Sequence, residues 1–388
     1  MKAYVVFLIL APLIVLGVLF LNSRLGAELH SPEVTLLPLQ FAGATTSDMG
    51  SGVPTEDVSS LPLYIPLEET LSERNEFRDL LNAELTFNLR SLYETYIDRI
   101  GANGLIATLE DARPYCHDEG HDLGRAIYAR LSDLGTGLRV CQDACFSGCM
   151  HGILMEFFTE TDEEFDEHVT LSDIAEKIHT VCAMNDMASL YKAGDCAHGI
   201  GHALMFLTGY NIPRALEYCE LLTTYPMQYY CATGAYMEYV TTKDPEESRT
   251  RGTFYPCDIG PYPAACFRYK LLLVARRHYT NGGTFADFEA ACLRLEDPYQ
   301  RGCFHGFGNA HAGPLQGGAL SLAELCRAGT REDQYVCIEG ALERLAKYHP
   351  EEAPHYCSSV AGWQNELCLE AAARNLYNLE KSFEYYGR

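Results

Sequence analysis

The chain has 388 residues, of which 47% are hydrophobic and 21% are charged, as is usual for a globular protein with a full apolar core. Its formal net charge is −24, and no local cluster of Lys and Arg offsets this excess. Because such a charge repels phosphate backbones, the composition excludes nucleic-acid binding as the main function. The length allows two average domains or one larger repeat domain.

The N-terminus begins with an apolar run of nineteen residues, 3–21. A helix of this length can cross a bilayer core, whereas the apolar region of a cleaved signal peptide has about 7–15 residues. We therefore expect residues 1–27 to be a membrane anchor, with a signal peptide as the alternative. Either segment directs the rest of the chain to the periplasmic or extracellular side, and an anchor would make the membrane a partner of the protein.

Cysteine usage agrees with export from the cytoplasm. The chain has sixteen cysteines, an even number, and no C-x-x-C pair of the kind that metal clusters use. Widely and regularly spaced cysteines are typical of disulfides formed in an oxidising compartment.

Composition changes twice after the apolar run. Residues 28–66 are rich in Ser, Thr, Gly and Pro and show no apolar period, which predicts a flexible tether. Residues 67–388 form the remaining region, a Cys-rich α-helical repeat domain. It opens with residues 69–100, which lack Gly and Pro and have helical periodicity, so we expect one long helix there.

A repeat of about 35 residues runs through this domain. The phrase C-A-H-G begins at Cys196, C-A-T-G at Cys231 and C-F-H-G at Cys303, and C-M-H-G at Cys149 belongs to the same series. Helical periodicity precedes and follows most phrases, so the repeating unit is a helical hairpin. Seven to eight hairpins predict an all-α fold, either an open α-solenoid or a closed α/α toroid, which share the same local pattern.

Each phrase follows another cysteine at short range, which places both near the turn of a hairpin. Antiparallel helices pack 8–10 Å apart, and a turn brings their ends within disulfide reach. The predicted bridges are Cys182–Cys196, Cys219–Cys231, Cys257–Cys266, Cys292–Cys303, Cys326–Cys337 and Cys357–Cys368. The pairing of the remaining four stays open: Cys116, Cys141, Cys145 and Cys149.

Histidines recur two residues after the phrase cysteine. Two phrases read H-x-x-G-H, at His117/His121 and His198/His202, and helical i,i+4 spacing lets two imidazoles converge on one metal ion. Zinc, copper and iron are the ions that imidazole suits, and disulfides leave no thiolate to compete. The candidate metal ligands are His117, His121, His198 and His202, with His151 and His305 at the equivalent positions of other repeats. We expect the first four to share one mononuclear site.

Carboxylates and glycines accompany the histidines. Acidic residues in or beside the phrases are candidates to orient the imidazoles or to act as general acid and base: Asp118, Glu119, Asp122, Glu156, Asp195 and Glu238. Glycine follows the phrase histidine in several repeats, which predicts close helix packing or, alternatively, a ligand resting on exposed backbone near helix N-termini.

Three classes of function remain. The histidines favour a metal-binding protein. A metal-free interaction scaffold for a protein or glycan is the second class, and a carbohydrate-active α/α-toroid enzyme, which needs two carboxyl groups about 5–9.5 Å apart in a cleft, is the third. The sequence has no G-x-S-x-G elbow and no P-loop, so it identifies neither catalytic residues nor whether the protein is an enzyme.

Overall fold

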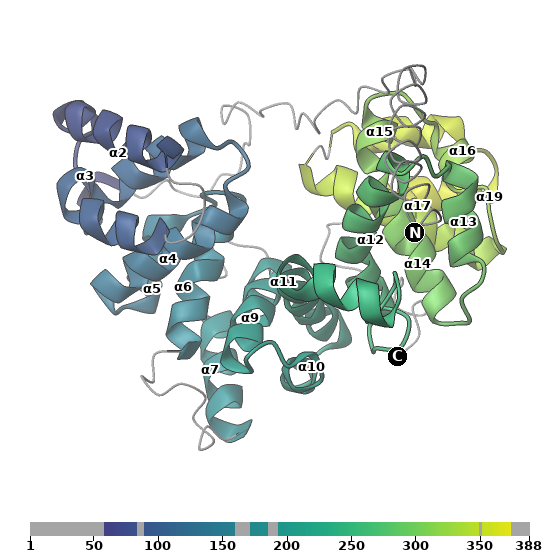
Figure 1. The fold of residues 1–388 in the computed structure, drawn as a ribbon, viewed down its shortest axis with the longest axis horizontal. Coiled ribbons are helices and arrows are strands. Elements are labelled where there is room, and N and C mark those ends of the chain that lie inside the picture. The colour runs from purple at the N-terminus through teal and green to yellow at the C-terminus, as the bar shows by residue number, and fades with distance from the viewer. Residues whose placement is uncertain (1–57, 84–88, 160–170, 185–192, 349–350, 374–388) are drawn as a thin grey trace, which may run out of the picture. The chain divides into compact units, whose positions relative to one another are not determined.

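A computed structural model describes residues 58–83, 89–159, 171–184, 193–348 and 351–373. The chain divides into two compact units, residues 1–49 and 50–388, and every described residue belongs to the second. The described residues form seventeen α-helices and no strand (Figure 1). The prediction of an all-α fold is confirmed.

The helices follow one another through short connections. Their bounds in the first half are α2 Leu71–Ala83, α3 Leu89–Ala112, α4 His117–Leu131, α5 Leu134–Cys141, α6 Gly148–Thr159, α7 Leu171–Ala183, α9 Ala193–Leu207, α10 Ile212–Cys219 and α11 Tyr225–Arg251. The later helices are α12 Pro263–Thr280, α13 Phe285–Cys292, α14 Tyr299–Ala310, α15 Ala312–Gln316, α16 Leu322–Leu325, α17 Arg331–Tyr348, α18 Ala353–Tyr356 and α19 Trp363–Ala373. Three short 3₁₀ helices complete the set: η1 Val58–Ser60, η2 Leu67–Glu69 and η3 Cys357–Ser359.

All sixteen cysteines are paired in eight disulfides. The six regular bridges predicted from the repeat are confirmed, and each joins two cysteines whose Cα atoms lie 5.3–6.0 Å apart. The four cysteines left open by the sequence form Cys116–Cys145 and Cys141–Cys149. Eight disulfides are typical of an oxidising, extracytoplasmic environment.

One helix was predicted wrongly, because residues 69–100 contain two helices rather than one. α2 and α3 pack on each other, with the ring of Phe77 6.0 Å from that of Tyr93 and 5.4 Å from that of Tyr96. All three side chains are buried. A single straight helix would leave these apolar faces exposed, whereas two packed helices remove them from water.

The hairpin pattern also fails at one bridge. Cys257 lies in the segment between α11 and α12, not at the end of a helix. Pro256 and Pro261 flank it, and proline lacks the amide hydrogen that a helix interior requires. The bridge to Cys266 therefore fastens a loop, rather than a helix, to the start of α12.

Eight of the described helices contain or directly follow the cysteine that begins a repeat phrase, and we call them the core helices. They pack on one another in chain order. Each contacts the next in the series α4, α6, α9, α11, α12, α14, α17 and α19 (Figure 1). The shorter helices contact them from outside this series, as α10 contacts α11 and α13 contacts α14. Equivalent positions of consecutive repeats therefore lie on adjacent helices.

Glycines allow the core helices to approach one another closely. A Cβ atom on Gly308 of α14 would overlap the carbonyl oxygen of Cys337 in α17, and one on Gly340 of α17 would overlap the carbonyl oxygen of His305 in α14. The two glycines thus occupy reciprocal positions at one helix crossing. Of the two explanations for the repeated glycine, close helix packing agrees with this contact.

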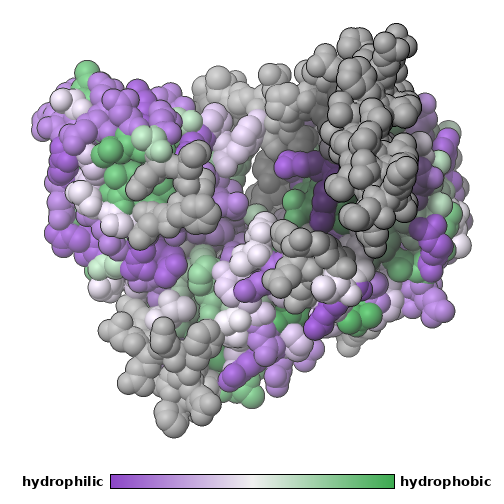
Figure 2. Space-filling model, in the orientation of Figure 1, coloured by the Kyte–Doolittle hydropathy of each residue, from purple (hydrophilic) through white to green (hydrophobic). Residues whose placement is uncertain are grey.

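The N-terminal predictions lie mostly outside the described residues. The proposed anchor, residues 1–27, is not among them, and none of the described helices is long and apolar enough to cross a membrane. Within the predicted tether, residues 58–66 are described, and Ile65 exchanges two hydrogen bonds with the side chain of Asn103 in α3. On the face that Figure 2 shows, hydrophilic side chains predominate and apolar residues form separate patches.

Alanine at Gly308 should destabilise the protein, because its methyl group must push α14 and α17 apart. We expect the free energy of unfolding to fall by about 1–3 kcal/mol, the usual effect of overpacking. Urea denaturation of the disulfide-intact protein measures this change. Gly317→Ala is the matched control, since a Cβ atom there meets only ordinary contacts at 3.6 Å or more. Equal stability of the two variants would contradict the packing role of Gly308.

Candidate metal centre

Three consecutive core helices bring four histidines together. His117 and His121 come from the first and second turns of α4, His151 from α6 and His202 from α9. In each residue one potential ligand atom lies within 4.8 Å of those of the other three. These four histidines, here called the histidine cluster, are therefore close enough together to bind one metal ion.

The rings of the cluster pack face and edge against one another. The ring centroids of His121 and His202 are 4.8 Å apart, those of His151 and His202 4.9 Å, and those of His117 and His151 5.0 Å. His121, His151 and His202 are buried, whereas His117 is half-buried. The cluster is thus largely buried, and His117 is its member that is partly accessible to solvent.

A carboxylate fixes the orientation of His202. Its Nδ1 lies 3.0 Å from Oε2 of Glu238 on α11, and the other oxygen of Glu238 accepts a hydrogen bond of 3.2 Å from the Tyr210 hydroxyl. Because a carboxylate only accepts, the proton of His202 resides on Nδ1 and the lone pair of Nε2 is directed into the cluster. Metal-binding histidines commonly have such a carboxylate partner.

A backbone carbonyl has the same effect on His117. Nδ1 of His117 lies 3.0 Å from the carbonyl oxygen of Phe146, an atom that can only accept. The proton of His117 is therefore on Nδ1, which leaves Nε2 as the potential ligand atom. Phe146 reaches this position because the Cys116–Cys145 disulfide holds the segment before α6 against the start of α4.

The other two members of the cluster are buried without hydrogen bonds among the described residues. Nε2 of His121 and both ring nitrogens of His151 have no partner there. Burial, together with neighbouring His202 and His117, lowers the pKa of both imidazoles well below 6.5, so both are neutral at physiological pH. Neutral imidazole is the form that binds metal ions.

His198 lies beside the cluster on the same helix as His202. The Thr233 hydroxyl donates to the Tyr230 carbonyl at 2.6 Å, so it accepts the proton of His198 Nδ1 at 2.7 Å. Nε2 of His198 then has a lone pair, and it lies 3.2 Å from Nε2 of His202. His198 is half-buried, so this fifth imidazole stands between the cluster and solvent.

The cluster contains three of the four histidines that the sequence grouped, His117, His121 and His202, and its fourth member is His151 rather than His198. The close approach of α9 and α11 explains why Nδ1 of His198 bonds to Thr233 of α11. A Cβ atom on Gly234 would overlap the His198 carbonyl, so Thr233 sits directly beside this turn of α9.

His305, the sixth candidate, belongs to a different group. Its Nε2 is 3.2 Å from Oε2 of Glu343, whose Oε1 pairs with the Arg268 guanidinium. All three side chains are buried. Although burial by itself raises the pKa of Glu343, Arg268 chiefly, with His305 and Tyr230, lowers it to about 2. This group is a buried ion pair from α12, α14 and α17, not an assembly of imidazoles.

Three of the carboxylates singled out from the sequence have different partners in the structure. Glu238 orients His202, as one interpretation expected, whereas Glu156 pairs with Arg90 and Arg125. Glu119 pairs with Arg113. Sequence reasoning missed the roles of Thr233 and Tyr210. Thr233 lies two residues after Cys231, the same position that the histidines occupy in other repeats, so alignment of the repeats could have identified it. Tyr210 lies outside the phrases, and no pattern indicated it.

Breaking the Arg268–Glu343 pair should strongly destabilise the fold. Glu343→Gln leaves the buried guanidinium without its counter-charge, so we expect the free energy of unfolding to fall by about 3–5 kcal/mol. The double variant Arg268→Met/Glu343→Leu removes both charges and should be markedly more stable than Glu343→Gln. Urea denaturation of each disulfide-intact variant compares them. A double variant as unstable as the single one would show that the pair is not the cause.

Comparison with known proteins offers no relative whose function could be carried over to these residues. No protein-family model, no curated protein and no solved structure matches this chain.

Proposed function

We propose that this protein binds a transition metal ion outside the cytoplasm, through His117, His121, His151 and His202. The observation that carries the proposal is the convergence of four imidazoles from three helices, two of which have their other nitrogen held by Glu238 or by the Phe146 carbonyl. This is the usual environment of metal-binding histidines, in which an acceptor fixes the tautomer and directs Nε2 to the ion.

The spacing of nitrogen atoms also supports an ion. Two ligands of a tetrahedral zinc ion, each bound at 2.0–2.1 Å, are about 3.3 Å apart. Nε2 of His198 and Nε2 of His202 are separated by 3.2 Å, although each nitrogen has a lone pair directed to the other. A cation between or beside them turns this repulsion into attraction, and His198 then serves as a further ligand on the solvent side.

A metal-free state is the competing interpretation. In it, a hydrogen bond joins Nε2 of His202 to Nε2 of His198, while Nδ1 of His202 remains bonded to Glu238. The same state leaves His121 and His151 buried without hydrogen bonds among the described residues, at a cost of about 1–3 kcal/mol for each unsatisfied group. A bound ion removes this cost, so the metal-bound state explains more of the site.

Imidazole chemistry sets the class of ion. All cysteines are in disulfides, so thiolate ligands are absent from the site and zinc, copper or iron is the expected occupant. Four protein ligands make a closed site of the structural kind, which would join α4, α6 and α9. The half-buried His117 and His198 leave one approach from solvent, through which an ion can enter.

The helical repeat is part of the same proposal. Sequential packing of the core helices and one disulfide per turn support a stacked series of hairpins, for which we favour an α-solenoid or α/α toroid. Such stacking places the phrase positions of neighbouring repeats side by side, which is how histidines from separate repeats reach one ion.

Elemental analysis tests the metal site directly. The purified disulfide-intact protein, reconstituted with zinc, copper or iron and then dialysed, should retain about one ion per chain. His121→Gln and His151→Gln each remove one ligand and should lower the metal affinity at least tenfold, while His355→Ala, an exposed histidine outside the cluster, should leave it unchanged. Thermal unfolding with and without metal is the second measurement, because an ion that binds only the folded protein raises its stability.

Two results would overturn the proposal. One is a parent protein that retains no metal after reconstitution although its disulfides and far-ultraviolet circular dichroism are native. The other is equal metal retention by the parent and by both cluster variants.

The charge of Glu238 should strengthen metal binding through His202. Glu238→Gln keeps an acceptor near Nδ1 but removes the negative charge, so we expect a loss of about 10–100-fold in metal affinity. Competition with a chromogenic chelator measures it. Glu332→Gln, an exposed carboxylate on α17, is the matched control and should bind metal as the parent does. An unchanged affinity in Glu238→Gln would mean that Glu238 only packs against His202.

A further inference from the structure

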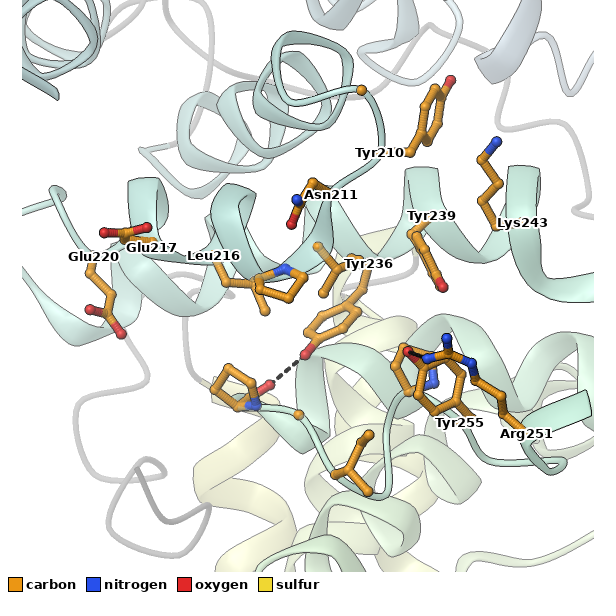
Figure 3. A pocket seen from close by; sticks show the side chains of 17 residues that line it. Tyr210, Asn211, Leu216, Glu217, Glu220, Tyr236, Tyr239, Lys243, Arg251 and Tyr255 are labelled. Atoms are coloured by element: carbon orange, nitrogen blue, oxygen red, sulfur yellow. Dashed lines mark hydrogen bonds between the residues drawn. The ribbon is translucent and has the colours of Figure 1, made fainter. Parts of the chain in front are cut away.

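A cavity lies on α10 and α11, beside the segment that leads into α12. Its volume is about 550 Å³, within the range of 300–1,000 Å³ typical of ligand sites (Figure 3). It is separate from the histidine cluster, and none of the four cluster histidines lines it. We call it the tyrosine pocket, because four tyrosines line it: Tyr210, Tyr236, Tyr239 and Tyr255.

The floor of the tyrosine pocket is apolar and firmly held. Leu216, Tyr236 and Pro256 are buried, and the Tyr236 hydroxyl donates to the carbonyl oxygen of Pro261 at 2.7 Å. That bond ties the segment before α12 to α11, and the Cys257–Cys266 disulfide fastens the same segment. At the rim, Ile259 exposes 66% of its surface. An apolar side chain of a ligand would find a preformed surface here.

Two cations stand at one end of the pocket. Arg251 lies 4.7 Å over the ring of Tyr255 and donates to its hydroxyl at 2.6 Å, and Lys243 lies 5.1 Å over the ring of Tyr210. Neither forms an ion pair with a carboxylate among the side chains that the structure describes. The tyrosine rings orient these cations without neutralising them, because a tyrosine ring carries no net charge.

Two carboxylates stand at the opposite end. Figure 3 shows Glu217 and Glu220 at one end of the pocket and Lys243 and Arg251 at the other. Both glutamates are exposed, and neither pairs with a cation among the described side chains. Asn211 lies between the ends, where its side-chain oxygen caps α10 by accepting from the Arg214 amide.

We propose that the tyrosine pocket binds a short peptide through both of its termini. The peptide carboxylate pairs with Arg251 and Lys243, the ammonium group pairs with Glu217 and Glu220, and an apolar side chain packs on the floor. A tripeptide is the probe for this pocket, and its fully extended backbone is about 10 Å long. Opposite charges at the two ends match a dipolar ligand, whereas a neutral saccharide would leave all four charges without partners.

Peptides with blocked termini test the two ends separately. Isothermal titration calorimetry on the full-length, disulfide-intact protein compares Ala-Leu-Ala with its N-acetylated and C-amidated forms. We expect each blocked form to bind at least tenfold more weakly than the free tripeptide. All titrations are run with chelator and again with zinc, so that a failure of the histidine cluster to bind metal does not affect the outcome.

Variants assign each terminus to its end of the pocket. Arg251→Gln should weaken binding of the free tripeptide about tenfold yet change binding of the C-amidated form little, because that form has already lost the interaction. Glu217→Gln/Glu220→Gln should act in the same way on the N-acetylated form. Arg276→Gln, an exposed arginine outside the pocket, is the control and should bind as the parent does.

The proposal is overturned if the free and blocked peptides bind equally, if the free tripeptide does not bind, or if maltotriose binds more tightly than the tripeptide. It is also overturned if Arg276→Gln weakens binding as much as Arg251→Gln, because the effect would then come from general charge rather than from the pocket.

Discussion

The backbones of three pairs of successive core helices, α4 with α6, α9 with α11, and α14 with α17, lie so close together that side chains are excluded from these crossings. Gly201 on α9 faces the carbonyl oxygen of Cys231 on α11, and Gly234 on α11 faces the carbonyl oxygen of His198 on α9. The same reciprocal contact joins Gly308 and Gly340 of α14 and α17. Each crossing fixes the rotation and the register of two helices at once, since any shift would drive a carbonyl into a Cα atom. A disulfide one helical turn away joins the α9–α11 and α14–α17 crossings to the shorter segment that precedes α11 or α17, through Cys219–Cys231 and Cys326–Cys337 respectively.

This packing determines which side chains are forced inward. In the repeats of α6, α9, α11, α14 and α17, the residue two positions after the phrase cysteine and the residue four positions later are buried or half-buried, whatever their chemistry. The sequence places polar groups there, so each must find a partner in a site without water. Two solutions are observed. Arg268 and Glu343 neutralise each other beside His305, whereas the imidazoles around His151 carry lone pairs that no described donor satisfies. The second group is the one for which we propose a bound ion.

Much of the fold and of the candidate site could be predicted from the sequence, because the repeat is marked by cysteine, histidine and glycine, each of which has few structural roles. The cysteine spacing predicted six of the disulfides, and the i,i+4 histidines predicted which helix faces lie toward the candidate metal site. Other features depend on the packing of residues far apart in the chain, which a single sequence does not encode visibly. The sequence does not show that His151 rather than His198 joins the cluster, because this depends on how α6 and α9 cross. Nor does it show that residues 69–100 contain two helices, because this depends on the packing of Phe77 against Tyr93.

The histidine cluster and the tyrosine pocket are separate, but Tyr210 and Glu238 connect them through hydrogen bonds. Tyr210 lines the pocket with its ring under Lys243, and its hydroxyl donates to the same Glu238 that accepts from His202. A peptide that drew Lys243 toward its carboxylate would change the surroundings of the Tyr210 ring, and the Tyr210–Glu238 bond would carry a displacement of that ring to Nδ1 of His202. Thermodynamic linkage makes such an effect reciprocal, so an ion held by His202 would alter peptide affinity by the same factor as the peptide alters metal affinity. The hydrogen-bonded carboxylate of Glu238 is thus the physical connection between the two proposed sites.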